Sequence, residues 1–180
     1  MRPASPPDTL RDRAAKVKLL ALDVDGVLTD AGIYYDAEGR ILKRFNVQDG
    51  LGIKTAQAAG LEVAVVSGLN HGSVEARVTE LGIAEYHAGH VHKPDVVRGI
   101  CSRLGVTLEE TAYLGDDWVD IAPMRIVGLP MAVANAQPEV LGLAKWISRQ
   151  PGGHGAVREA IRFLLLCQDK LETACARWAD

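Results

Sequence analysis

Several features by which a sequence is often assigned to a class are missing here. No apolar run approaches the roughly 20 residues needed to span a bilayer, and residues 1–16 contain no apolar segment of the kind found in a secretory signal. Basic residues form no long run and the formal net charge is -3, so nothing favours a nucleic-acid partner. An anionic ligand would have to be held by a few placed cations and backbone amides.

Cysteine is scarce as well, and no metal-binding pattern of soft ligands is evident. The cysteines are odd in number and not spaced like metal ligands, which fits reduced thiols in a cytoplasmic protein best. His87, His90 and His92 follow a His-x-x-His-x-His pattern. No cysteine or other fourth ligand lies nearby, which favours ordinary loop residues over a zinc site. The three cysteines are Cys101, Cys167 and Cys175.

What is present is the composition of an ordinary globular domain. Of the 180 residues, 48% are hydrophobic and 24% are charged, and this length suits one compact domain with a sizeable core. Residues 1–16, rich in proline and charge, are predicted to form a loose lead-in, and residues 17–180 a single domain. No internal repeat or second-domain linker is evident.

Short apolar runs alternate with amphipathic stretches from Lys18 onward. Several runs are apolar at consecutive positions, which is typical of strands covered on both faces. Their alternation with helices predicts an α/β fold with a parallel sheet. The expected strands are 18–24, 61–66, 83–87, 111–114 and 130–133. The expected helices are 50–59, 72–81, 93–104, 118–125, 138–141 and 155–170, with C-caps at Gly60, Gly82 and Gly105.

One segment breaks this alternation. Residues 33–45 consist of two β-prone arms around an Asp-Ala-Glu-Gly turn, which predicts a β-hairpin. It falls between the first expected strand and the first expected helix, so it is an insertion into the α/β pattern.

The strongest chemical signal is Asp23-Val24-Asp25-Gly26, directly after the apolar run 19–22. Ligands of a parallel sheet bind at the carboxyl ends of its strands, so Asp23 and Asp25 fall where chemistry is expected. Their spacing lets two carboxylates approach one cation. The alternative is a polar turn with Asp25-Gly26 at its corner, but two charges at the end of a buried strand need a partner.

A second carboxylate cluster, Asp116, Asp117 and Asp120, follows another apolar run and Gly115. Oxygen-only ligands in a partly hydrated site suit Mg²⁺. Asp116 or Asp117 could also cap the helix that begins near Trp118, and capping and metal binding are compatible. We expect Asp117 and Asp120 to serve mainly in support.

Two weaker elements complete a phosphate-binding set. Ser67 and Gly68 follow the run 63–66 and offer a hydroxyl and a backbone amide at a third strand end. Lys93 and Pro94 open a predicted helix, where a cation and a helix N-terminus can both face a phosphate. Each element is common by itself, and their order along the chain makes the set specific.

That order resembles the haloacid dehalogenase superfamily of phosphatases. The matching motifs are Asp23-x-Asp25, Ser67, Lys93 and Gly115-Asp116-Asp117-x-x-Asp120. The resemblance spans about residues 18–165 and implies a three-layer, Rossmann-like sheet and a Mg²⁺-dependent phosphatase.

The resemblance also implies a mechanism. Asp23 attacks phosphorus and forms an aspartyl-phosphate. Asp25 protonates the leaving oxygen and then deprotonates the water that cleaves the intermediate. Mg²⁺ is held by Asp23, the backbone carbonyl of Asp25 and Asp116. Ser67 and Lys93 orient and stabilise the phosphoryl oxygens.

Members of this superfamily often insert a cap domain after the first or second motif. Here only about 40 residues separate Asp25 from Ser67, and 25 lie between Ser67 and Lys93. Neither interval can hold a folded cap. The site is therefore expected to be open, and either the substrate is large or a neighbouring subunit provides a lid.

A closer resemblance is to the 3-deoxy-D-manno-octulosonate 8-phosphate phosphatase family, carried by residues 23–30, 45–50, 75–77 and 152–159 and by the hairpin. It implies hydrolysis of that sugar acid phosphate in lipopolysaccharide biosynthesis. It also implies a homotetramer whose hairpins form an inner barrel and whose neighbouring subunits complete each site. An arginine among the contacts suits a carboxylate. The implied substrate contacts are Asp25, Asn46, Val47, Gln48, Asp49, Gly50, Gly68, Arg77 and Lys93.

Two positions depart from the family pattern. Leu69 stands where an arginine commonly follows the second motif, and Lys54 stands where a second arginine is often found. Leucine cannot provide a guanidinium, so recognition of the carboxylate is weaker or rearranged. A nine-carbon 2-keto-3-deoxy sugar acid 9-phosphate of the sialic-acid type is therefore an alternative substrate.

Other functional classes fit less well. A phosphoprotein phosphatase suits an open site but not a tetramer with partly covered clefts. A non-catalytic regulatory module would be expected to lack Asp23, Asp25 or Lys93, and all are present. A phosphotransferase or mutase needs tight exclusion of water, which a capless chain hardly supplies.

Overall fold

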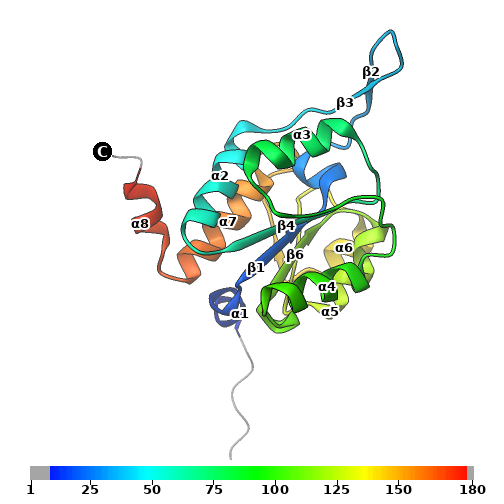
Figure 1. Cartoon of the computed structure of the whole chain (residues 1–180). Coiled ribbons are helices and arrows are strands. Elements are labelled where there is room, and N and C mark those ends of the chain that lie inside the picture. The colour runs from blue at the N-terminus through cyan, green and yellow to red at the C-terminus, as the bar shows by residue number, and fades with distance from the viewer. Residues whose placement is uncertain (1–8, 178–180) are drawn as a thin grey trace, which may run out of the picture.

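The computed structural model of the chain describes residues 9–177, which are organised around a six-stranded parallel sheet (Figure 1). Its spatial order is β5-β4-β1-β6-β7-β8. The register places Leu22 beside Val65 on one side and Leu114 on the other, so neighbouring strands end at the same level. The strands are β1 (Leu19–Leu22), β4 (Glu62–Val66), β5 (Glu85–His87), β6 (Thr111–Gly115), β7 (Leu129–Ala132) and β8 (Trp146–Ile147).

The central strands form because their residues are apolar at consecutive positions. All four residues of β1 and the last four of β4 are buried, as expected for strands with helices on both faces. The five predicted strands are thereby confirmed. The sequence did not predict β8, which is only two residues long and partly exposed, so it carries no apolar run.

Helices cover both faces of the sheet and complete three layers (Figure 1). On one face α2 packs against α7, and α7 also contacts α1. On the other face α5 contacts both α4 and α6. The helices are α1 (Leu10–Lys16), α2 (Val47–Ala58), α3 (Gly72–Leu81), α4 (Pro94–Leu104), α5 (Ile121–Ile126), α6 (Pro138–Leu143), α7 (Ala156–Cys167) and α8 (Leu171–Ala176). Among them and the rest of residues 9–177, no helix has the length and apolarity of a membrane span.

The helix ends follow the predicted signals in most places. Gly82 and Gly105 are left-handed C-caps of α3 and α4, whereas the C-cap of α2 is Ala59, one residue before the predicted Gly60. The helix expected over 118–125 begins as a 3₁₀ turn, η3 (Trp118–Asp120), before α5. The predicted terminal helix 155–170 is also shorter, since α7 ends at Cys167 and α8 follows.

The prediction of a loose lead-in over residues 1–16 is wrong for its second half. Residues 10–16 form α1, which begins with a capping box between Thr9 and Asp12. Ala14 is buried against the core, so one turn of apolar contact stabilises this short helix. Residues 1–8 lie outside the described residues.

The predicted hairpin is present and projects away from the body of the molecule (Figure 1). Its strands, β2 (Tyr34–Tyr35) and β3 (Ile41–Leu42), pair antiparallel. Large apolar side chains on it are exposed, with Tyr35 67% and Leu42 54% accessible. The described chain between the first and third motifs contains only this hairpin, η1 (Val24–Leu28), α2, β4, α3 and β5, and therefore no cap domain.

The segment before α7 closes over the turn η1, which carries the first motif. The backbone N–H of Gly153 donates to the Val27 carbonyl at 3.0 Å. A Cβ on Gly152 would lie 1.7 Å from the carbonyl oxygen of Gly26. The two backbones thus approach more closely than any side chain would allow, which explains a glycine at position 152.

Candidate active site

The carboxyl ends of the central strands bring the predicted motifs to one edge of the sheet. Asp23 directly follows β1, and its backbone N–H continues the ladder by donating to the Leu114 carbonyl at 3.1 Å. Ser67 follows β4 and Asp116 follows β6. This is the edge at which parallel sheets bind ligands.

Lys93 is the central charge of the site. Its side chain is fully buried, and its Nζ donates to Asp23 Oδ1 at 2.8 Å and to Asp120 Oδ1 at 2.7 Å. Burial lowers the pKa of Lys93, but the charges of Asp23 and Asp120 outweigh it, so its pKa lies above the ordinary value. Lys93 therefore remains a cation and fixes two carboxylates at once.

Asp120 holds the loop that carries Asp116. Its Oδ1 also accepts from the Tyr113 hydroxyl at 2.8 Å, and its Oδ2 accepts from the backbone N–H groups of Asp116 (2.9 Å) and Asp117 (3.3 Å). Asp117 caps η3 by accepting from the Trp118 N–H at 2.7 Å. Both oxygens of Asp120 are thus engaged in hydrogen bonds within the protein.

The acidic side chains fit a divalent cation. Asp23, Asp116 and Asp120 each offer a carboxylate oxygen within 4.8 Å of the others. Asp116 Oδ1 is buried without a hydrogen-bond partner, which is costly unless something else binds it. Gly26 makes room for this carboxylate, since a Cβ there would lie 1.9 Å from Asp116 Oδ2. An all-oxygen set of this kind suits Mg²⁺.

Without a cation the two inner carboxyls resist ionisation. Burial, reinforced by the charge of Asp120, raises the pKa of Asp23 to about 7 even though Lys93 opposes the shift. Burial and the charges of Asp23, Asp120 and Asp117 raise the pKa of Asp116 to about 8. The carboxyls of Asp23, Asp116 and Asp120 carry more negative charge than Lys93 offsets, which is the electrostatic condition for binding a metal ion.

These shifts predict that Mg²⁺ stabilises the protein far more at high pH than at low pH. Both folded pKa values lie above the unfolded values of about 4, so metal-free stability falls as pH rises from about 4 to about 8, where the native carboxyls have also ionised. Below this range Mg²⁺ must displace protons, and its apparent affinity should rise about 10- to 100-fold per pH unit. Melting temperatures with and without Mg²⁺ at about pH 5.5 and about pH 8.5 test this. Asp116→Asn is the control and should lose most of the Mg²⁺-induced increase.

Ser67 and the following loop lie beside this centre. Ser67 is fully buried, and its hydroxyl oxygen accepts from the Leu69 N–H at 3.2 Å. A Cβ on Gly68 would meet only Val91, at 4.0 Å. Leu69 itself is 47% exposed. The loop therefore presents an apolar side chain at the position where the family resemblance implies an arginine.

Sequence reasoning missed Lys43. It follows β3 on the return arm of the hairpin, and its Nζ donates to Asp25 Oδ1. No motif or spacing marks this lysine, because its role depends on how the hairpin folds back onto η1. The sequence placed it only in the second arm of the predicted hairpin, residues 33–45.

The predicted substrate contacts differ in their exposure to solvent. Asp49 is 1% exposed, and its carboxylate accepts from the N–H groups of Gly155 (3.3 Å) and Arg158 (2.7 Å). It joins α2 to α7, which is a structural role, and Gly50 beside it is also buried. Val47, by contrast, is 81% exposed. Burial argues against substrate contact for Asp49 and Gly50.

Asn46 and Arg77 form a local unit at the start of α2. Asn46 caps α2 by accepting from the N–H groups of Gln48 and Asp49. Arg77 donates to the Asn46 carbonyl at 3.3 Å and to Glu80 at 2.8 Å. A cavity of about 330 Å³ opens beside this arginine. Its lining residues are Lys43, Phe45, Val47, Ser73, Ala76, Arg77 and Glu80.

Of the three histidines in the His-x-x-His-x-His pattern, His87 takes part in local contacts. His87 lies 2.8 Å from Glu85 Oε2 and 3.0 Å from Arg103, and its ring is 6.5 Å from that of His90. The hydrogen bond from Arg103 holds the pKa of Glu85 at about 2. Among residues 9–177 the histidines join no metal-binding group.

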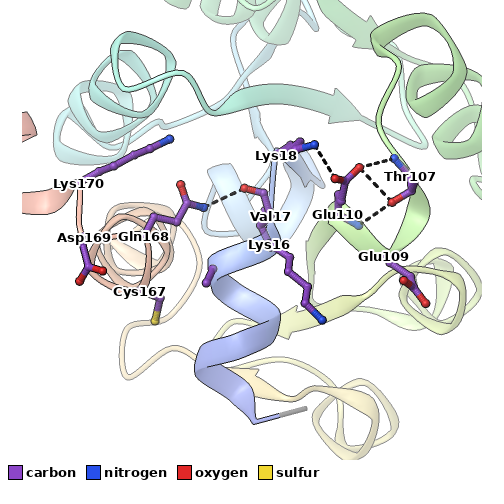
Figure 2. Close-up of a pocket in the computed structure, with 11 residues that line it drawn as sticks. Lys16, Val17, Lys18, Thr107, Glu109, Glu110, Cys167, Gln168, Asp169 and Lys170 are labelled. Carbon is purple, nitrogen blue, oxygen red and sulfur yellow. Dashed lines mark hydrogen bonds and ion pairs between the residues drawn. The ribbon is translucent and has the colours of Figure 1, made fainter. Parts of the chain in front are cut away.

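A larger cavity, of about 670 Å³, lies at the opposite end of the sheet. Figure 2 shows Lys18 reaching Glu110 and the side chain of Gln168 reaching the Val17 carbonyl at its edge. Lys18 directly precedes β1, so this cavity is far along the strands from Asp23. It contains none of the predicted site residues.

A Rossmann-like parallel sheet without a cap, with two aspartates after its first strand and a buried lysine between carboxylates, defines a haloacid dehalogenase-like hydrolase. The model of that family matches residues 82–161. The protein of Escherichia coli (strain K12) named 3-deoxy-D-manno-octulosonate 8-phosphate phosphatase KdsC is 43% identical over 162 residues, covering 90% of this chain and 86% of that protein. The chain belongs to this phosphatase family and is a phosphoric monoester hydrolase.

Solved structures agree with this assignment. The 3-deoxy-D-manno-octulosonate 8-phosphate phosphatase of Yersinia pestis superposes with a TM-score of 0.89 at 40% identity, covering 92% of this chain and 94% of that one. The enzyme of the same name from Moraxella catarrhalis, in complex with a magnesium ion, a phosphate ion and a KDO molecule, has a TM-score of 0.91 at 34% identity. That match covers 93% of this chain and 97% of the other.

Proposed function

We propose that the protein hydrolyses 3-deoxy-D-manno-octulosonate 8-phosphate to the free sugar acid and phosphate, with Mg²⁺ as its metal. The observation that carries the proposal is Lys93, buried between Asp23 and Asp120 beside the unpartnered Asp116 Oδ1. Such a centre binds a cation and a phosphate together, as the Moraxella enzyme does with magnesium and phosphate ions.

The first step is nucleophilic attack by Asp23. A carboxylate oxygen of Asp23 forms a bond to phosphorus, the bond from phosphorus to the ester oxygen breaks, and its electron pair leaves with that oxygen. Asp25 gives its proton to the departing oxygen. Lys93 holds Asp23 Oδ1 at 2.8 Å, which fixes the rotation of the nucleophile before substrate arrives.

The second step releases phosphate. Asp25, now ionised, takes a proton from water as the water oxygen attacks phosphorus, and the bond to Asp23 breaks. Ser67 and the backbone after it bind phosphoryl oxygens, and Lys93 stabilises their charge. The Mg²⁺ ion would be held by Asp23, the Asp25 carbonyl and Asp116, and it supplies positive charge that offsets the charge of the transferring group. Asp117 and Asp120 keep Asp116 in place.

The substrate's carboxylate needs a cation outside the phosphate site. Arg77 is the candidate in this chain, because it borders the 330 Å³ cavity next to Asn46 and a guanidinium can bind both carboxylate oxygens. Val47 and Gln48, which are uncharged and exposed at the start of α2, are candidates for contacts with the rest of the sugar. Leu69 cannot take this role, and its exposed apolar side chain keeps a nine-carbon sialic-acid-type 9-phosphate as the second candidate substrate.

We further propose a homotetramer in the cytoplasm, acting in lipopolysaccharide biosynthesis. The projecting hairpin exposes Ile33, Tyr34, Tyr35 and Leu42, an apolar surface that a second copy of the hairpin would cover. Free thiols at all three cysteines suit a reducing compartment. Light scattering should give about four times the 19.3 kDa chain mass.

Phosphate release from a panel of esters tests the substrate. The panel contains 3-deoxy-D-manno-octulosonate 8-phosphate, nine-carbon keto-sugar acid 9-phosphates, common hexose phosphates and a phosphopeptide, each with Mg²⁺. The octulosonate should be preferred by kcat/KM about tenfold or more over hexose phosphates, because only the acids offer a carboxylate to Arg77. Preference for a nine-carbon acid would keep the mechanism and change the substrate. Preference for the phosphopeptide would contradict the proposal.

A further inference from the structure

The hairpin contributes one charged side chain to the site. Lys43 directly follows β3, and its side chain is 0% exposed. An enclosed ammonium group is costly unless a carboxylate pairs with it. Among residues 9–177 that carboxylate is Asp25, which accepts from Lys43 Nζ through Oδ1. The hairpin is thus joined by an ion pair to the aspartate two residues after the nucleophile.

Asp25 depends on this lysine for its orientation. Its side chain is 29% exposed and so faces the open side of the site. Within the described chain, Lys43 is the hydrogen-bond partner of its carboxyl group, and that bond occupies Oδ1 and leaves Oδ2 without a protein partner. A carboxyl that exchanges a proton with a substrate oxygen must present one oxygen within hydrogen-bond reach. A misplacement of about 1 Å is enough to lower the rate greatly.

We propose that Lys43 is a positioning residue for the acid–base group of Asp25. It fixes the carboxyl through Oδ1, so that Oδ2 carries the proton to the leaving oxygen. Lys43 itself exchanges no proton and touches no reacting atom. The proposal rests on the phosphatase mechanism above but not on the identity of the sugar.

The test compares two leaving groups. A sugar phosphate releases an alkoxide, which needs the proton of Asp25, whereas p-nitrophenyl phosphate releases a stable phenolate that does not. The value of kcat/KM reports steps up to the departure of this group. Lys43→Met should lower kcat/KM about 10- to 100-fold for the sugar phosphate and less than about threefold for the nitrophenyl ester. Arg40→Met, which removes an exposed cation from the same hairpin, should change neither.

Two outcomes overturn the proposal. Equal losses with both esters mean that Lys43 only supports the structure, and no loss with either means that Asp25 does not need it. If Lys43→Met does not fold by circular dichroism, Lys43→Arg is measured instead. It keeps the charge but moves the donor, so the same selective loss is expected and an equal loss again overturns the proposal. If the wild type rejects the octulosonate, only the sugar assignment fails, and the comparison uses another alkyl phosphate hydrolysed through Asp23.

Discussion

Replacing Asp23 with asparagine should lower phosphate release about 10⁴-fold or more for every substrate the protein accepts. The amide nitrogen and oxygen of asparagine cannot form the aspartyl-phosphate, and the second aspartate after β1, Asp25, is assigned to proton transfer. Substrate binding should change far less, because Lys93, Ser67 and the loop after β6 remain. Steady-state phosphate release measures the loss, and binding of inorganic phosphate checks the remaining site.

The same substitution should leave the fold intact, which separates chemistry from stability. Burial raises the pKa of Asp23 to about 7, so the ionised carboxylate destabilises the metal-free folded state. Asparagine removes this charge. The metal-free melting temperature at about pH 8 should therefore stay level or rise. Asp169→Asn is the matched control, because Asp169 is an exposed residue with positive φ, a conformation that asparagine tolerates. Activity above about a hundredth of wild type in Asp23→Asn would mean that another group is the nucleophile.

Replacing Lys93 with methionine should cost about 3–5 kcal/mol of unfolding free energy. The methionine side chain fills a similar volume but leaves Asp23 and Asp120 buried without their shared cation. Since a neutral carboxyl is cheaper to bury than a carboxylate, the loss should be greater at about pH 8 than at about pH 5.5. Urea unfolding at the two pH values measures this. Activity should be lost as well.

A second substitution distinguishes the loss of charge pairing from poor packing of the methionine side chain. Asp120→Asn added to Lys93→Met removes one of the two stranded charges, so the double variant should be more stable than Lys93→Met alone. Lys145→Met, at an exposed position before β8, is the control and should change stability by no more than about 0.5 kcal/mol. A double variant as unstable as the sum of the two single losses would show that the charges are not the reason.

Much of this architecture could be predicted from local sequence, because the responsible interactions are local. The run Leu19–Leu22 is apolar at every position and is followed at once by Asp23. The sequence therefore predicted the strand, its burial and the position of the reactive carboxylate from the same five residues. Gly82 and Gly105 marked helix ends through a backbone conformation that glycine adopts at low cost. Parallel strand order then brings their ends to one edge of the sheet.

The features that the sequence did not predict correctly also have physical explanations. Helix α1 depends on a capping box at Thr9 and on the burial of Ala14, and a proline-rich preceding segment concealed both. Lys43 meets Asp25 only after the hairpin folds back. Asp49 belonged to a segment that resembles a family's substrate contacts, yet its carboxylate is occupied by the start of α7. Contacts between distant segments depend on the whole fold. A short motif therefore does not show which distant residue will bind to its side chains.

The close approach of Gly152 to Gly26 bears on the order in which the molecule is made. The turn that carries Asp25 is completed by the Gly153 N–H bonded to the Val27 carbonyl, a contact between segments more than a hundred residues apart. On a ribosome at about 5–20 residues per second, the first motif emerges several seconds before its partner. Closing so long a loop is also a late, entropically costly event in refolding. The turn η1, which follows Asp23, should therefore be among the last parts of the chain to become rigid. A nascent or truncated chain is expected to form its central strands before it has phosphatase activity.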